Sequence, residues 1–171
     1  MVPWPSGLKF EVKEIEMGSI NPKILDCFVL AKPVEVVHMS HLKFDHSIIR
    51  NSEKLVISDL QDLIEKETIF AKLPNQWVHI SKITGGNQQF LKFIRLIIIE
   101  WKTAKRGCGT RLSAGYSDGL CVPAVLKSIE EEFQGEYLSS RAIKIPLCHS
   151  TSVYISFFER ICGNRLEMKI I

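Results

Sequence analysis

The alternation of apolar and polar side chains near the end of the chain is the feature that most constrains the fold. The apolar positions are Val153, Ile155, Phe157 and Ile161 before a turn, and Leu166, Met168 and Ile170 after it. A period of two is typical of a β-strand with one buried face. Gly163-Asn164 fits a two-residue hairpin turn. In the register that this turn predicts, Arg160 faces Glu167 and Ile161 faces Leu166. The C-terminus is therefore expected to lie within a sheet.

Further segments bring the expectation to six to eight strands and two short helices. Strand patterns occur at 8–13, 24–30, 34–39, 42–50, 77–83 and 90–101. A capping box that begins at Ser58 predicts a helix over 59–67. A second helix is predicted from Val122, with Pro123 in its first turn and Gly135 after its end. Neither an internal repeat nor a linker is visible. The fold class predicted is α+β, mainly antiparallel, with a single compact domain over residues 8–171.

Length and composition bear on cofactors, membrane spans, secretion and disulfides. The 171 residues are enough to bury a core, so the chain needs no disulfide or metal to fold. Neither a metal nor another cofactor is expected. The longest apolar run, 90–101, is shorter than the roughly 20 residues that span a bilayer. The N-terminus lacks the pattern of a secretory signal. The five cysteines include no Cys-x-x-Cys pair and are predicted to be free, mostly buried thiols in a reducing compartment.

Charge is distributed unevenly along the chain. Residues 82–111 hold seven basic side chains and one acidic one, a net charge of +6, whereas residues 118–136 have a net charge of −4. Gly107 and Gly109 let the backbone of the basic loop approach a ligand, although no complete phosphate-loop motif is present. This pattern favours binding of phosphate, in RNA or in anionic lipid headgroups. The candidate binding residues are Lys92, Arg95, Lys102, Lys105, Arg106 and Arg111.

Catalytic and metal-binding patterns are weak. Glu100 and Lys102 at the end of the predicted strand 90–101 resemble the Glu-x-Lys of Mg²⁺-dependent PD-(D/E)xK nucleases, but no acidic residue lies on the strand before it. Cys121 at a helix start could pair with His149 as a nucleophile. A pH-responsive or metal-binding role for His38, His41 and His46 is a further alternative to ordinary surface or core positions. No catalytic activity is predicted.

The N-terminal segment Pro3-Trp4-Pro5 carries a large aromatic ring on a stiff backbone, so residues 1–7 are predicted to be a self-association arm. With this arm, its length, its mildly basic balance and its closing strands 153–170, the chain resembles the small matrix proteins of negative-strand RNA viruses, those of plant rhabdoviruses in particular.

The resemblance implies a non-enzymatic structural protein that self-assembles as a homo-oligomer. Such a protein binds and condenses the viral nucleocapsid and its RNA, and contacts the inner face of the envelope membrane. It would be found in the virion and the host cytoplasm. The alternative function is a cytosolic or nuclear nucleic-acid-binding module that forms no lattice.

Overall fold

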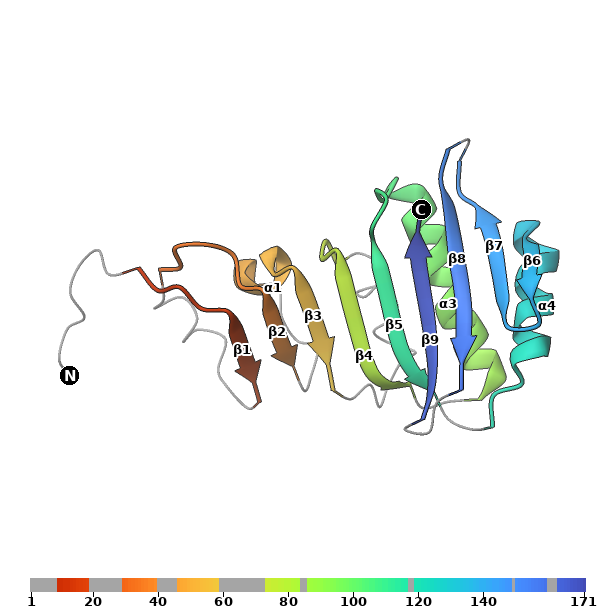
Figure 1. Cartoon of the computed structure of the whole chain (residues 1–171), viewed down its shortest axis with the longest axis horizontal. Coiled ribbons are helices and arrows are strands. Elements are labelled where there is room, and N and C mark those ends of the chain that lie inside the picture. The colour runs from red at the N-terminus through yellow and green to blue at the C-terminus, as the bar shows by residue number, and fades with distance from the viewer. Residues whose placement is uncertain are drawn as a thin grey trace.

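One sheet carries all the strands of the described chain (Figure 1). The computed structural model describes residues 9–18, 29–39, 46–58, 73–83, 86–116, 119–148, 150–159 and 163–171. The strands are β1 (Glu14–Met17), β2 (Val36–Met39), β3 (Lys54–Ile57), β4 (Trp77–Ile83), β5 (Arg111–Tyr116), β6 (Glu136–Ser139), β7 (Ala142–Pro146), β8 (Ser152–Phe158) and β9 (Asn164–Ile170). The helices are α1 (Ser47–Asn51), α3 (Asn87–Thr103) and α4 (Val122–Phe133). The strands lie in the order β1-β2-β3-β4-β5-β9-β8-β7-β6.

The sheet is mixed, so the predicted α+β class agrees with the structure but the mainly antiparallel sheet is wrong. Strands β1 to β5 are parallel to their neighbours, and β5, β9, β8, β7 and β6 pair antiparallel. The connections between the parallel strands are 14 to 27 residues long, whereas those from β6 to β9 are two to five residues long. Parallel neighbours need a long crossover and antiparallel neighbours need only a tight turn. The length of the connections therefore distinguishes the parallel half of the sheet from the antiparallel half.

The first four parallel strands share a pattern of burial. Around each of the first four strands, a buried or half-buried residue is followed by two apolar residues, three and five positions later. The sets are Val12, Ile15 and Met17; Val34, Val37 and Met39; Ser52, Leu55 and Ile57; and Asn75, Val78 and Ile80. The Asn75 side-chain amide donates to the carbonyl oxygens of Ile49 (2.7 Å) and Ser52 (2.9 Å). Asn75 thus ties the chain just before β4 to the chain just before β3.

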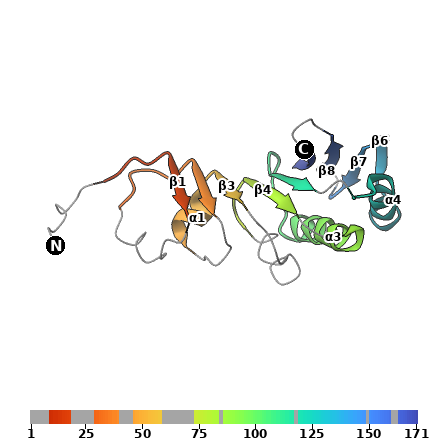
Figure 2. The ribbon, with the colours of Figure 1, turned by 90° about the horizontal axis from the view of Figure 1, so that it is seen from below.

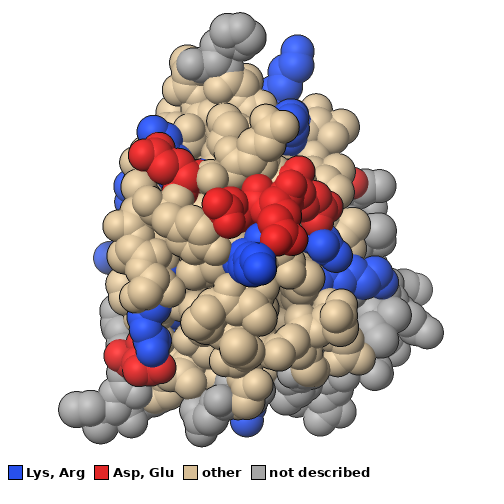
Figure 3. All heavy atoms as spheres, turned by 90° about the vertical axis from the view of Figure 1, so that its right-hand side faces the viewer, with Lys and Arg blue, Asp and Glu red and all other residues tan. Residues whose placement is uncertain are grey.

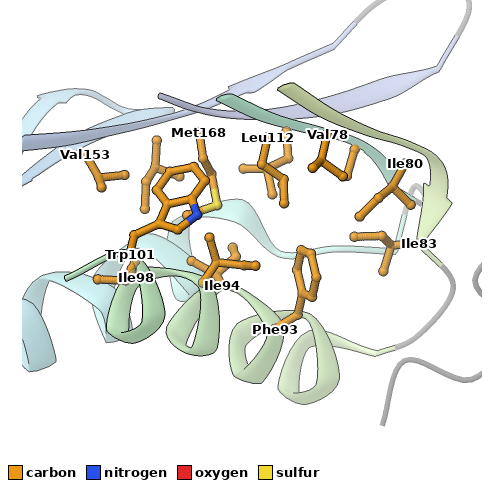
Figure 4. Packing of buried hydrophobic residues seen from close by; sticks show 14 of the residues in the cluster. Val78, Ile80, Ile83, Phe93, Ile94, Ile98, Trp101, Leu112, Val153 and Met168 are labelled. Carbon is orange, nitrogen blue, oxygen red and sulfur yellow. The ribbon is translucent and has the colours of Figure 1, made fainter. Parts of the chain in front are cut away.

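The three described helices lie on the same side of the sheet (Figure 2). Helix α3 supplies the central part of this cover, and α4 packs against α3 and β7. The buried side chains of α3 are Phe90, Leu91, Phe93, Ile94, Ile97, Ile98 and Trp101. Most recur every three or four residues, which is the spacing of one helix face. They meet residues of β4, β5, β8 and β9, including Val78, Leu112 and Met168 (Figure 4).

The strand prediction for 90–101 is wrong, because this segment is part of the helix α3. Its isoleucines favour a strand by propensity, but burying one face against the sheet overrides that preference. The 17-residue α3 also makes the prediction of two short helices wrong for the described chain. The strand predicted at 42–50 is likewise wrong where it is described, because Ser47–Asn51 is α1.

Some predicted boundaries shift, and others lie outside the described residues. Residues 9–13 are not part of β1, although Phe10 forms an isolated parallel bridge with Leu30. The helix predicted at 59–67 lies outside the described residues, as does most of the strand predicted at 24–30.

The strand at 77–83, the second helix and the C-terminal pair of strands are confirmed. Helix α4 ends at Phe133, and the capping residue Gln134 has a left-handed backbone (φ 55°). The predicted register of the C-terminal pair is wrong: Glu167 lies opposite Ser156 and Leu166 opposite Phe157. The connection spans 159–163 rather than two residues, and this moves every pair along the strands.

Candidate functional site: the open face of the sheet

The face of the sheet opposite the helices carries basic, aromatic and other polar side chains. No helix of the described chain covers this face, which we call the open face (Figure 2). Successive residues of a strand point to opposite faces. On β4, for example, Val78 and Ile80 are buried beneath the sheet, whereas Trp77 and His79 are half-buried on the open face. The same alternation repeats on β2, β8 and β9. It places a largely polar surface over a continuous core.

One row of open-face residues runs across six neighbouring strands. The strands β3, β4, β5, β9, β8 and β7 place Lys54, Trp77, Arg111, Lys169, Tyr154 and Lys144 opposite one another in that order. We call these six residues the cross-strand row. Neighbouring strands lie about 4.8 Å apart, so the row extends for roughly 24 Å. It contains four cations and two aromatic rings and no acidic residue.

The strand pairing continues beyond the cross-strand row in both directions and reaches an acidic residue on each side. Val36 and then Glu14 follow Lys54 at one end. Glu136 of β6 lies opposite Lys144 at the other. The adjoining helix α4 carries the consecutive acids of its sequence IEEEF. Figure 3 shows carboxylates gathered on the end of the molecule that α4 and β6 form. Acidic residues therefore lie at both ends of the positively charged part of the open face.

Both aromatic rings of the cross-strand row have a lysine nearby. The Lys54 ammonium lies 4.2 Å from the centre of the Trp77 ring, and that of Lys144 lies 5.9 Å from the Tyr154 ring. Such cation–π contacts are worth about 0.5–1 kcal/mol at exposed sites. They hold positive charge and a flat apolar surface next to each other.

A second row on the open face contains an imidazole and a hydroxyl in contact. His79 of β4 lies opposite Ser113 of β5, and His79 Nδ1 is 2.8 Å from Ser113 Oγ. Burial lowers the pKa of His79, and the positive charges of Arg165 and Lys54 lower it further. Its imidazole is therefore neutral at pH 7. Glu167 follows Ser113 in this row, and Arg165 Nε lies 3.2 Å from a carboxylate oxygen of Glu167.

The His79–Ser113 pair has the residue types of a nucleophile and its base, but its geometry is that of a structural contact. Ser113 is only 3% exposed, so its hydroxyl offers little access to a substrate. Within the described ranges, no group of three or more His, Cys, Asp or Glu residues is placed to hold a metal ion.

Trp77 and Arg111 stand between two hollows of the open face. The smaller hollow, of about 230 Å³, lies over β5 and β9 and is also lined by Ser113, Arg165, Glu167 and Lys169. The larger hollow, of about 400 Å³, lies at the starts of the parallel strands and is also lined by Glu35, Glu53, Lys54 and Gln76. The middle of the cross-strand row thus offers recesses on both sides of an indole and a guanidinium.

The structure distributes the six predicted phosphate-binding residues over three elements. Lys92, Arg95 and Lys102 belong to α3, Lys105 and Arg106 to the loop that follows, and Arg111 to β5. Helix α3 covers the face of the sheet opposite Arg111 (Figure 2). Only Arg111 is therefore shared by the predicted set and the cross-strand row. Phosphate or lipid binding by the other five stays a prediction.

Arg95 and Arg106 are among those of the six residues that have contacts within the protein. Arg95 on α3 forms an ion pair with Glu132 on α4. The Arg106 guanidinium donates to the carbonyl oxygens of Leu73 and Pro74, and burial lowers its pKa. Arg106 thereby holds the loop after α3 against the chain before β4. These contacts reduce the availability of both side chains to a phosphate.

The nuclease hypothesis loses the strand on which it depended. Glu100 and Lys102 lie in the last turns of α3, so they do not end a strand of the sheet. The three cysteines in the described chain, Cys108, Cys121 and Cys148, are free and exposed, so the predicted burial is wrong for them. Hydrogen bonds from Thr151 and Ser150 lower the pKa of Cys148 to about 7.

Other predicted residues are separated or lie outside the description. His38 on β2 lies 2.6 Å from a carboxylate oxygen of Glu14, whereas His46 caps α1 by accepting from the Ile48 backbone N–H. His41, His149 and the arm Pro3-Trp4-Pro5 lie outside the described residues. Self-association through that arm stays a prediction.

The fold defines a mixed-sheet α+β protein with one face covered by helices and one open face. Residues 1–118 match the family model described as a domain of unknown function, DUF3557, so the protein belongs to this family. The match extends through β5 and therefore covers the parallel half of the sheet. No curated protein and no solved structure matches the chain.

None of these findings connects the chain to viral matrix proteins, and the nucleocapsid, membrane and virion roles stay predictions. No helix of the described ranges has the length and apolar character needed to cross a bilayer.

Proposed function

We propose that the protein is a non-enzymatic binding module that holds single-stranded nucleic acid across the open face of its sheet. The observation that carries this proposal is the cross-strand row. Across six strands it combines four positive charges with two aromatic rings along a path of roughly 24 Å. The proposed function is a more specific form of the nucleic-acid-binding module that the basic segment of the sequence predicts as the alternative to a matrix protein.

Single-stranded nucleic acid needs both kinds of side chain in the row. Lysine and arginine neutralise phosphates along the backbone, and each exposed aromatic face can stack with a base. Arg111 and Lys169 are exposed, and they lie between Trp77 and Tyr154 in the row. A single-stranded nucleic acid that lies along the row would contact both positive charges and aromatic rings. Sheet faces that present aromatic side chains bind single-stranded RNA in this way.

An acidic peptide is the competing partner. It would use the four cations but would give Trp77 and Tyr154 no stacking partner. A partner that gains from both rings fits the open face better than one that gains from the charges alone. Competition by polyglutamate therefore tests the choice between the two partner classes.

The experiment compares two charge-matched triple variants in fluorescence anisotropy with a labelled single-stranded RNA of about 12 nucleotides. One variant changes three cations of the row, Lys54→Gln, Arg111→Gln and Lys169→Gln. The control changes three exposed lysines elsewhere, Lys92→Gln, Lys102→Gln and Lys105→Gln. All six side chains are at least partly exposed, so both variants are expected to fold.

At about 50 mM salt we expect the row variant to lose about tenfold or more in affinity and the control to stay within about twofold of wild type. The opposite ranking would move the site to α3 and contradict the proposal. Displacement of the RNA by polyglutamate at an equal concentration of charges would identify a general polyanion surface and also contradict it.

A further inference from the structure

Two glutamates line the larger hollow of the open face, where the proposed function calls for positive charge. Glu35 and Glu53 line this hollow together with Lys54, Trp77 and Arg111. Carboxylates beside a phosphate path repel the backbone and lower the affinity for any nucleic acid. They become favourable where they accept hydrogen bonds from a base that presents an amino group.

We propose that this hollow, of about 400 Å³, is a base-reading pocket that selects cytosine over uracil. The inference rests on the proposed function and adds the base class that the open face prefers. Cytosine carries an amino donor where uracil carries a carbonyl acceptor. A carboxylate of Glu35 or Glu53 accepts from the amino group of cytosine and repels the carbonyl oxygen of uracil.

The surroundings of the two carboxylates supply the other contacts that a bound nucleotide needs. Trp77 also lines the hollow and carries an indole ring that can stack with a base, and Gln76 carries an amide that can both donate and accept. Lys54 and Arg111 lie on either side of Trp77 in the cross-strand row, where they can hold the phosphates that flank the base.

The smaller hollow offers a place for the next nucleotide of the bound nucleic acid. Arg111 lines both hollows, and the smaller one adds Arg165 and Lys169 to its wall. Cations outnumber the single carboxylate of Glu167 there, so that recess fits a phosphate. Two successive nucleotides would thus lie on the two sides of Trp77, with one recess reading a base and the other holding the backbone.

The test measures the affinities of a cytosine octamer and a uracil octamer of RNA for three proteins at about 50 mM salt. These are wild type, the double variant Glu35→Ala/Glu53→Ala, and the control Glu16→Ala/Glu136→Ala. The control removes two exposed carboxylates on strands at the margins of the sheet, outside both hollows.

We expect wild type and the control to bind the cytosine octamer about fivefold or more tightly than the uracil octamer. In Glu35→Ala/Glu53→Ala the preference falls below about twofold, because uracil binding improves as the repulsion is lost. Equal binding of the two octamers by wild type, or an unchanged preference in that variant, overturns the inference and leaves the proposed function standing. Failure of wild type to bind either octamer overturns both.

Discussion

Substitution of two tryptophans, one on each side of the sheet, distinguishes a loss of RNA binding from a loss of folding stability. Trp77 lies on the open face with the Lys54 ammonium 4.2 Å from its ring centre, whereas Trp101 of α3 is 4% exposed and packs in the core beside Met168 (Figure 4). Loss of one base-stacking ring costs about 1–3 kcal/mol of binding, which corresponds to roughly 5- to 150-fold in affinity. Truncation of a buried tryptophan costs about 3–5 kcal/mol of folding stability.

We therefore expect Trp77→Ala to weaken RNA binding at least about fivefold while lowering the free energy of unfolding by only about 1 kcal/mol. Trp101→Ala is expected to show the reverse: a large loss of stability with near wild-type affinity in the protein that remains folded. Anisotropy measures the first quantity and urea unfolding the second. Binding should also quench the fluorescence of wild type more than that of Trp77→Ala. If a folded Trp77→Ala binds RNA within about twofold of wild type, the stacking argument is refuted.

Three further outcomes follow from the structure. A Cβ atom at Gly115 would overlap the Ser81 carbonyl oxygen, so Gly115→Ala is expected to lower the free energy of unfolding by about 2 kcal/mol or more; an unchanged urea midpoint would show that the β4–β5 contact is looser. The folded-state pKa of His79 is lowered, so the unfolded chain protonates first as pH falls below about 6.5, and stability declines until the folded pKa is reached. His79→Gln should weaken this acid dependence between pH 7.5 and 5.5, and an identical dependence would exclude His79 as its source. The Cys148 thiol, with a pKa of about 7, should be alkylated with a midpoint near neutral pH, and Thr151→Ala should move the midpoint upward; Cys108 alone reacting near pH 7 would contradict this.

The sequence correctly predicts those helices and strands for which the apolar spacing and the residues at the ends indicate the same type of element. Pro123 in the first turn of α4 and the apolar stripe behind it define that helix, and the alternation from Val153 onward defines β8 and β9. In α3, the isoleucine-rich run favours a strand by propensity, while its buried positions also have helical spacing. The covered face of the sheet decides between the two.

The cross-strand row could not be predicted from the sequence, because it depends on the order of the strands. Lys169 of β9 lies between Arg111 of β5 and Tyr154 of β8 only because the last strand inserts into the middle of the sheet. Local patterns contain no information on that insertion. The one available signal was that Tyr154 and Lys169 occupy outward positions of alternating strands.

The salt dependence of RNA binding tests the central claim most directly. If the four cations of the cross-strand row neutralise phosphates of single-stranded RNA, the logarithm of the association constant falls with a slope near −3 against the logarithm of salt concentration. Affinity then drops about 50-fold between 50 and 200 mM salt, and Arg111→Gln alone makes the slope shallower by about 0.7. A wild-type slope near zero, or a slope that Arg111→Gln leaves unchanged, would contradict binding through this row.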